Sequence, residues 1–388
     1  MRIIVLGYIV RGPLGGLVWH HLQYVMGLHR LGHDVTFIED SDDYESCYDP
    51  VRDATTSDPS FGLEFTSAVF DFAGISERWA YFDAHSNTWF GPGGAAAREM
   101  LRSADLLLNL SGVNPMRDWF LNAPYRVLID TDPVFTQIRH LKDGKKMQDA
   151  LLHTAFFTFG ENFGKPECSI PGDGLPWLPT RQPIVLDAWP VRPGRPGANF
   201  TTVMQWDSYP AQEHGGRSFG MKSASFNPYL DLPRRTEDKL ELAIGSSSAP
   251  RDQLRNYGWI VTDPLAVTRT AATYQEFIRD SKAEFTVAKH GYVATRSGWF
   301  SERSAAYLAS GRPVVTEDTG FSDWLRADGG VMAFDSPDSA AAAIERVNRD
   351  YARQCRRARA VAEEFFESGA VLNHLLRRAT ETKSAAAK

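Results

Sequence analysis

Cysteine, long apolar runs and clustered positive charge are all scarce in this sequence. The three cysteines among its 388 residues, Cys47, Cys168 and Cys355, are scattered and odd in number, a pattern that suits a reducing compartment and offers no metal-ligand spacing. No apolar stretch approaches the roughly 18 residues that a transmembrane helix needs. The apolar run after Met1 is short and interrupted by Arg11, which argues against a signal peptide. We therefore expect a soluble cytoplasmic protein.

Positive charge is outnumbered by negative charge. There are 42 lysines and arginines against 48 aspartates and glutamates, for a formal net charge of −6. Binding to a phosphate backbone needs a concentrated basic face, and the sequence shows none. This balance argues against nucleic acid as the main partner.

The sequence has the length for two domains and a break between them. A prior of roughly 150 residues per domain gives two domains for 388 residues. Residues 171–196 are rich in proline, glycine and tryptophan, a composition that marks a linker. We expect one domain at 1–190, a second at 197–360, and a C-terminal helix followed by a disordered tail at 361–388.

Strand and helix patterns alternate through both halves. Residues 2–40 show a buried strand, a glycine turn, an amphipathic helix and a second strand. From residue 336 onward the chain is expected to be helical, with a break at Gly369. The alternation predicts two Rossmann-like, doubly wound α/β domains, whose ligands bind beyond the carboxyl ends of the strands. Further strands are expected at 106–110, 126–129, 155–159, 200–205, 239–243, 259–261, 284–287 and 313–316.

The strand expected at 126–129 delivers two carboxylates to such an end. Asp130 and Asp132 follow it, and their mutual repulsion and burial would raise the pKa of one of them and make it a general base. Asp132 lies farther beyond the strand and is slightly preferred, with His153 as a second-line candidate near another strand end. The alternative is that one aspartate caps the turn before Pro133.

The most informative segment runs from residue 297 to residue 315. Gly298 precedes a helix that Ser301 caps and Gly311 stops. The free N–H groups at such a helix start suit a diphosphate, and Glu302 is placed to accept hydrogen bonds from sugar or ribose hydroxyls.

Three basic side chains accompany this segment. Lys289 and His290 follow the strand expected at 284–287 and should face the same cleft. Arg303 lies in the first turn of the helix, where it either supports the donor site or is a surface residue.

From Gly298 to Val315, and more loosely over most of the chain, the sequence resembles a glycosyltransferase of the GT-B type. It is closest to the "glycosyl transferases group 1" sequences that include spore-protein-like (CgeB-like) members. Two family features are absent: the glutamate usually found where Ala306 stands, and a pair of acids spaced eight apart, since Gly298 occupies one of their places. Glu302 lies one helical turn before Ala306, on roughly the same face.

The resemblance implies a nucleotide-diphosphate sugar bound by the second domain and an acceptor bound by the first. It also implies that the C-terminal helix expected within 361–388 crosses back and packs on the first domain. Arg217 and Lys222 match basic residues that neutralise the donor diphosphate without a metal in similar proteins. Gly15 and Gly16 would floor the acceptor cleft, and His20 lies near the place of a catalytic histidine in many inverting members. A tight turn for the glycines and packing for the histidine are the alternatives.

Two other ligand motifs are weak. Residues 40–43 contain a D-x-D, which binds Mn²⁺ or Mg²⁺ in another glycosyltransferase fold, but the basic donor loop favours a solvated acidic loop, and we predict no metal. The glycines after the first strand do not complete G-x-G-x-x-G, so an NAD or FAD site is disfavoured, although Glu39 and Asp40 end the second strand as a ribose-binding acid would.

Together these patterns predict metal-independent glycosyl transfer from a nucleotide sugar to an acceptor hydroxyl, with no cofactor beyond that co-substrate. Three alternatives stay open: a sugar-nucleotide epimerase of the same fold, a dinucleotide-dependent oxidoreductase, and a non-catalytic sugar-binding relative that lacks the acid at Ala306. The nucleotide base, the sugar, the acceptor, the stereochemistry and the oligomeric state also stay open.

Overall fold

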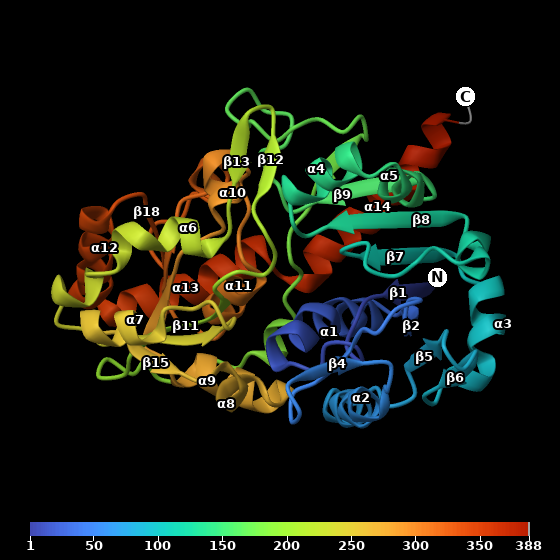
Figure 1. The fold of residues 1–388 in the computed structure, drawn as a ribbon, viewed down its shortest axis with the longest axis horizontal. Helices are drawn as coiled ribbons and strands as arrows, with labels where there is room; N and C mark the ends of the chain where they lie inside the picture. The colour runs from blue at the N-terminus through green and yellow to red at the C-terminus, as the bar shows by residue number, and fades with distance from the viewer. Residues whose placement is uncertain (387–388) are drawn as a thin grey trace.

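The computed structural model describes the backbone of residues 1–386 and the side chains of residues 1–381. The chain forms two α/β domains that lie side by side (Figure 1). One domain is built on an eight-stranded sheet and the other on a six-stranded sheet. This is the two-domain, Rossmann-like architecture that the alternating pattern predicts.

The first sheet has the strand order β10-β9-β8-β7-β1-β2-β5-β6, and every neighbouring pair is parallel except β5 with β6. All five strands expected in this half are present, and β5, β6 and β10 are additional. The chain builds outward from β1 in one direction and then from β7 in the other, so the strand order reverses between β1 and β7. The strands are β1 (Arg2–Leu6), β2 (Asp34–Asp40), β5 (Trp79–Asp83), β6 (Thr88–Phe90), β7 (Leu106–Leu110), β8 (Tyr125–Asp130), β9 (Ala155–Thr158) and β10 (Trp177–Pro179).

The second sheet is parallel throughout, with the order β15-β14-β11-β16-β17-β18. The five expected strands are present within two residues at each end, and β18 adds an edge. Here the strand order reverses between β11 and β16. The strands are β11 (Phe200–Gln205), β14 (Leu240–Gly245), β15 (Ile260–Thr262), β16 (Ala283–Thr286), β17 (Val314–Glu317) and β18 (Val331–Phe334).

Two short antiparallel hairpins lie outside these sheets. One pairs β3 (Cys47–Asp49) with β4 (Ala54–Thr56), and the other pairs β12 (Gln212–His214) with β13 (Arg217–Phe219). Both hairpins fall in segments where the sequence shows no strand pattern.

The central strands form because their residues are apolar on both faces. Ile3, Ile4, Val5 and Leu6 of β1 are all 0% exposed. A parallel strand buries both faces when helices cover both sides of its sheet. This burial explains why β1 appears in the sequence as a continuous apolar run.

Fourteen α-helices are described within residues 1–386. They are α1 (Gly15–Arg30), α2 (Ser60–Phe72), α3 (Ala97–Arg102), α4 (Phe135–Lys142), α5 (Gly144–Leu151), α6 (Lys222–Phe226), α7 (Arg251–Tyr257), α8 (Pro264–Thr268), α9 (Ala271–Asp280), α10 (His290–Ala294), α11 (Glu302–Ala309), α12 (Pro337–Arg349), α13 (Tyr351–Phe365) and α14 (Ser368–Ala386). None of them is long and apolar enough to cross a membrane.

The last helix returns to the first domain, as the GT-B pattern predicts. α14 packs against α1, β8 and β9 (Figure 1). At Gly27 of α1, a Cβ atom would stand only 2.6 Å from Leu372 Cδ1, so the absence of a side chain there lets the two helices approach. Leu372 and Leu375 are 0% exposed and belong to the same core cluster as Ile3 and Val5. The first domain's core is therefore completed by the C-terminal helix.

The break before α14 lies at Phe366 and Glu367 rather than at Gly369, which corrects the prediction. The Glu367 carboxylate accepts hydrogen bonds from the backbone N–H groups of Gly369 and Ala370, each at 2.8 Å. Glu367 therefore caps the new helix, and Gly369 lies in its first turn. The helix continues to Ala386; the final residues of the expected disordered tail, 387–388, lie outside the described residues.

The docking of α14 yields a test of stability. Leu375→Ala should lower the free energy of unfolding by about 2–5 kcal/mol, because it removes a fully buried side chain and leaves a cavity. Urea unfolding followed by tryptophan fluorescence measures this loss. The matched control is Asn373→Ala, an exposed position in the same helix, which should change stability by less than about 0.5 kcal/mol. Equal effects in the two variants would contradict the docking.

Candidate active site

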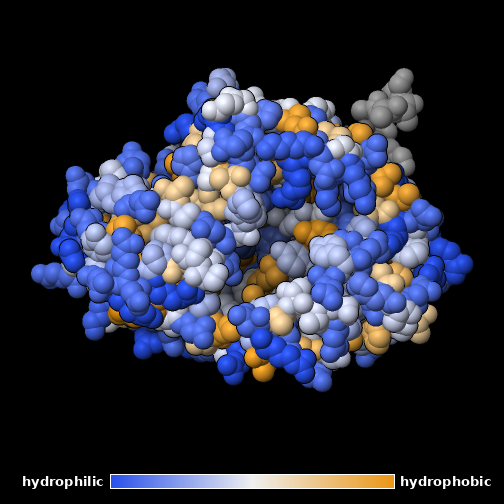
Figure 2. Space-filling model, in the orientation of Figure 1, coloured by the Kyte–Doolittle hydropathy of each residue, from blue (hydrophilic) through white to orange (hydrophobic). Residues whose placement is uncertain are grey.

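A cleft of about 1210 Å³ lies between the two domains. Figure 2 shows it as a hollow near the middle of the face, with apolar side chains inside a mostly hydrophilic rim. Both points of strand reversal open onto it: its lining includes Tyr8 after β1, Ser111 after β7, Trp206 after β11 and Lys289 after β16. Open α/β sheets bind their ligands at such points, so this cleft is the candidate active site.

Positive charge is unequally divided between the two walls of the cleft. Of the described residues that line it, the second domain contributes Lys222, Arg251, Lys289 and Arg303, whereas the first domain contributes only Arg139, which is exposed. Clustered cations raise the local concentration of anions. The second domain's wall is thus the side that favours an anionic ligand.

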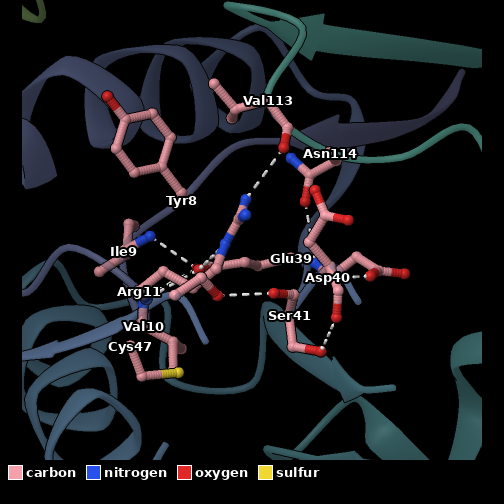
Figure 3. A network of polar contacts seen from close by, with 12 residues as sticks. Tyr8, Ile9, Val10, Arg11, Glu39, Asp40, Ser41, Cys47, Val113 and Asn114 are labelled. Carbon is pink, nitrogen blue, oxygen red and sulfur yellow. Dashed lines mark hydrogen bonds and ion pairs between the residues drawn. The ribbon is translucent and has the colours of Figure 1, made fainter. Parts of the chain in front are cut away.

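The loop after β1, which forms part of the first domain's wall, is fixed by one buried carboxylate (Figure 3). This carboxylate is that of Glu39. It accepts hydrogen bonds from the backbone N–H groups of Ile9, Val10 and Arg11 at 2.6, 2.8 and 2.8 Å, and from Arg11 Nε at 3.2 Å. Burial raises the pKa of Glu39, and the Arg11 charge and the three N–H groups oppose that rise. Arg11 also donates to the Val113 carbonyl oxygen at 3.3 Å.

Asp132, the preferred base of the sequence analysis, lies in the cleft but is held by the other domain. Lys289 Nζ donates to Asp132 Oδ1 at 2.8 Å, and the hydroxyls of Tyr209 and Tyr292 donate to the same carboxylate. Burial favours its neutral form, but the Lys289 charge and these hydrogen bonds outweigh burial, so the pKa of Asp132 lies below its usual value. Asp132 is therefore a stable anion that joins the two domains, and a weak proton acceptor.

Two other predicted catalytic residues do not line the cleft. Asp130 is 1% exposed and accepts a hydrogen bond from the side-chain amide of Gln137 at 3.0 Å. His153 is buried between the Ala150 carbonyl oxygen and the Asn109 side chain, and burial lowers the pKa of its imidazole to about 4. Both side chains turn into the first domain rather than toward the cleft, which corrects their assignment as bases.

The helix α11 begins as predicted. Ser301 Oγ accepts the N–H of Arg303 at 3.2 Å, and the helix starts at Glu302. Glu302 lines the cleft and makes no hydrogen bond or ion pair with another described side chain, so its carboxylate can accept from a ligand. Arg303 is buried instead: Nε donates to Glu284 at 2.6 Å and another N–H to the Val203 carbonyl oxygen at 2.7 Å. Arg303 thus fastens α11 to the sheet while reaching the cleft.

Lys222 begins α6 and lines the cleft. Its ammonium forms no hydrogen bond or ion pair within residues 1–381. Burial, and next the positive charge of Arg303, hold the pKa of Lys222 well below its usual value. An anion placed beside it would favour the charged form and gain a charge-assisted hydrogen bond. Lys222 is therefore the second domain's clearest contact for an anionic ligand.

Behind Lys222, Glu317 ends β17 and supports the same wall. Its carboxylate accepts the N–H of Ala288, the residue before Lys289, at 3.0 Å. Burial raises the pKa of Glu317 to about 7, although this hydrogen bond and the Lys222 charge oppose the rise. Glu317 therefore changes charge near neutral pH directly behind two cleft lysines.

Three predicted donor-binding residues lie outside the lining. Arg217 is exposed on β13, and its guanidinium donates to the Ala294 carbonyl oxygen at 2.9 Å. His290 lines a separate, smaller hollow of about 730 Å³ beside the β12–β13 hairpin. Gly298 lies against Asn162. The structure thus brings together Lys222, Lys289, Ser301, Glu302 and Arg303, but not these three.

The predicted acceptor residues divide between two roles. A Cβ atom at Gly15 would stand 2.4 Å from the Thr270 carbonyl oxygen, so this glycine permits a contact between the domains rather than with an acceptor. Gly16 does line the cleft, beside Tyr274. His20 also lines it, but both ring nitrogens are buried and burial lowers the pKa of the imidazole. His20 therefore presents a neutral ring edge to the cleft.

The carboxylates of Asp40 and Asp43 in the D-x-D segment are paired with an arginine. Arg117 donates to both oxygens of Asp40 at 3.0 Å and to Asp43 at 2.8 Å. The acidic segment therefore has its counter-charge within the protein, and it lies outside the cleft lining.

The residues that sequence analysis misses include Tyr8, Tyr209 and Tyr292, which line the cleft, and Glu317, which lies behind its lining. Tyr8 and Glu317 come at or directly after the end of a central strand, so a scan of every strand end would include them. Tyr209 lies in an irregular segment that precedes β12 and carries no local signal.

Comparison with known proteins shows the fold. No protein-family model matches this chain, and no curated protein matches it. An alpha-glucosyltransferase solved in complex with UDP-glucose and DNA containing an abasic site is similar over 97% of this chain and 98% of its own, at 11% identity and a TM-score of 0.62. Anabaena HepE in complex with UDP and glucose is similar over 98% and 99%, at 10% identity and a TM-score of 0.56.

A third solved structure, AviGT4, a glycosyltransferase involved in avilamycin A biosynthesis, is similar over 97% of this chain and 96% of its own, at 13% identity and a TM-score of 0.51. These likenesses confirm the predicted GT-B fold, with two Rossmann-like domains facing a cleft. The narrower resemblance to the group 1 family stays a prediction.

The charge of Glu317 yields a test by pH. Its pKa is about 7 in the folded chain against an ordinary value of 4.5, so the folded state keeps a proton that the unfolded state has lost. Its contribution to stability is therefore full below about pH 4.5 and is lost as the pH rises through 7. Glu317→Gln should flatten the fall in the free energy of unfolding between pH 5 and pH 8, measured by urea unfolding. The exposed Glu45→Gln is the control; an unchanged slope in Glu317→Gln would refute the assignment.

Proposed function

We propose that this chain transfers a sugar from a nucleotide-diphosphate sugar to a hydroxyl group of an acceptor. The observation that carries the proposal is the cleft itself, whose second-domain wall presents Lys222 and Glu302, neither of which forms a hydrogen bond or ion pair through its side chain within residues 1–381. A diphosphate and the hydroxyls of a ribose or sugar need these two kinds of group. The GT-B neighbours solved in complex with UDP-glucose or with UDP and glucose support the proposal.

In the proposed complex, Lys222 and the start of α11 hold the donor diphosphate. The helix start adds N–H groups and a partial positive charge to the lysine ammonium. During transfer, the bond between the anomeric carbon and the diphosphate oxygen breaks while the acceptor oxygen bonds to that carbon. The departing diphosphate gains negative charge, and fixed cations stabilise that charge most. Because these side chains already provide counter-charge, we propose that transfer does not require a metal.

Asp132 is the proposed group on the acceptor side. It is the partly buried carboxylate that the first domain contributes to the lining, and the acceptor hydroxyl must lose its proton as the new bond forms. Its lowered pKa makes it a weak base, which is sufficient where the proton leaves late, after the attacking oxygen has become acidic. Through Lys289 and the two tyrosines it also sets the gap between the domains.

Two alternative functions lose support. In a dinucleotide-dependent oxidoreductase, Glu39 would bind a ribose, but here the loop N–H groups already fill its carboxylate. In a non-catalytic relative, the missing acid at Ala306 would be decisive, but Ala306 is 3% exposed and outside the cleft lining. Glu302 occupies the cleft-lining position of that helix. An epimerase of the same fold would release an altered sugar nucleotide without any acceptor, which product analysis detects.

The donor site is tested by removing one cation inside the cleft and one outside it. Lys222→Ala should weaken UDP binding by about 10- to 100-fold, because a hydrogen bond to a charged group contributes roughly 1.5–3 kcal/mol. Isothermal titration calorimetry in excess chelator measures the Kd. Arg217→Ala, which removes an exposed cation outside the lining, should leave the Kd within about twofold. Equal losses in both variants would refute the site, and a strict need for Mn²⁺ or Mg²⁺ would refute metal independence.

The acceptor side is tested at Asp132. Asp132→Asn should lower the rate of UDP release from UDP-glucose by about 10²–10⁴-fold, the usual contribution of a general base, with little change in the UDP Kd. Tyr209→Phe is the matched variant, since it removes one hydrogen bond to the same carboxylate and keeps the charge. A loss in Tyr209→Phe as large as that in Asp132→Asn would show that Asp132 acts by holding the domains. Wild-type rates in both variants would place the base elsewhere.

A further inference from the structure

Tyr8 occupies the first domain's point of strand reversal, directly after β1, and its half-buried side chain lines the cleft. In Figure 3 its ring points away from the network that fixes the following residues. The ring is therefore presented to the cleft rather than used in the polar network behind it.

The position of the Tyr8 ring is fixed from several sides. Its backbone N–H donates to His21 Nε2 at 3.2 Å, and its ring meets the His21 ring edge-on at 5.1 Å between centroids. The next three N–H groups along the chain are bound to Glu39, and the Arg11 guanidinium lies 5.9 Å from the ring centroid. A rigid aromatic ring loses little conformational entropy when a ligand binds it.

The Tyr8 hydroxyl makes no hydrogen bond within residues 1–381. Burial raises the pKa of this phenol to about 12, and the negative charges of Glu302 and Asp132 add to that rise against Arg11. The hydroxyl therefore keeps its proton at neutral pH and is available as a donor. Two of the charges that act on it thus lie in the cleft, Glu302 on the proposed donor side and Asp132 on the proposed acceptor side.

The first domain contributes several apolar or aromatic side chains to the cleft lining besides Tyr8, namely Leu14, Leu17, Tyr48 and Val113, together with polar ones such as Ser111 and Thr131. Of the charged groups that the described first-domain residues contribute to the lining, Asp53 and Asp132 are acidic and only the exposed Arg139 is basic. From the second domain, Asp263 also lines the cleft. Burial, the hydrogen bond to Asp53 and, to a smaller extent, the Asp263 charge raise the pKa of the Tyr48 phenol. A chain of phosphates would meet more carboxylates than basic side chains on this wall, whereas it needs clustered lysines and arginines.

We propose, resting on the glycosyl transfer proposed above, that the acceptor is an uncharged molecule that lays a ring face on Tyr8. A sugar ring and an aromatic ring both offer such a face, with C–H groups or π-electrons toward the phenol. The Tyr8 hydroxyl donates a hydrogen bond to the same acceptor and so aligns it with the donor sugar. Tyr8 is thus the residue that determines acceptor specificity, and nucleic acid is not the acceptor.

The test uses phenyl β-D-glucoside, which carries both kinds of ring, with the full chain saturated with UDP. Saturation-transfer difference NMR should show transfer to the glucoside, and the protons that receive most of it identify whether the sugar or the phenyl ring lies on the protein. Tyr8→Ala should raise the glucoside Kd at least tenfold, and Tyr8→Phe, which keeps the ring, should raise it only a few-fold. Tyr44→Ala, an exposed tyrosine outside the lining, should leave the Kd unchanged.

Three results would overturn the proposal: no saturation transfer to the glucoside, the same Kd in Tyr8→Ala as in wild type, or specific binding of a 13-base-pair DNA duplex that competes with the glucoside. The UDP Kd of each variant shows that the variant is folded. If UDP binds but the glucoside Kd is unchanged in the Tyr8 variants, the acceptor proposal fails while the proposed function stands. If wild type binds no UDP, both fail.

Discussion

One buried carboxylate sets the geometry on which the first domain's side of the cleft depends. Glu39 lies one residue before the end of β2, beside β1, and accepts the N–H groups of the three residues after Tyr8. Left without partners in a buried loop, each of these groups would cost roughly 1–3 kcal/mol. Because Glu39 binds them all, the chain leaves β1 along an irregular path and is still rigid. The same carboxylate neutralises Arg11, which is not among the lining residues of the cleft, so Arg139 is the one basic side chain that the described residues of this wall present to it.

The two domains are joined at more than one place. On the cleft side, one carboxylate, Asp132, receives three donors from the second domain. Farther along, the start of α1 touches α9, where Gly15 admits the Thr270 carbonyl and Trp19 Nε1 donates to the Ala271 carbonyl at 2.8 Å. Beside the Asp132 contact, Phe135 of the first domain packs with Met221 and Tyr292 of the second in one buried apolar cluster. Apolar packing and hydrogen bonds therefore join the domains together with the Asp132 contact.

The fold was largely predictable because parallel, doubly buried strands are continuous apolar runs in the sequence, and because Ser301 marks its helix start by a local cap. The site was predictable only in part. The end of a strand predicts where a residue lies in the fold but not the direction of its side chain, which depends on partners far away in the sequence. Asp130 is buried and accepts a hydrogen bond from Gln137. Arg217 lies on the β12–β13 hairpin and is exposed. The roles of Tyr8 and Glu317 depend on neighbouring residues from several strands, which no local sequence pattern predicts.

The helix α14 is synthesised last, although it completes the core of the first domain. Leu372 and Leu375 belong to the core cluster that includes β1, yet the ribosome synthesises them after every strand of both sheets. Domains generally fold during synthesis in the order in which they emerge. Here the first domain emerges first but cannot close its core until residues 368–379 have left the exit tunnel. During that interval the α1 surface around Gly27 stays uncovered, so the nascent chain exposes an apolar face for as long as the whole second domain takes to be translated.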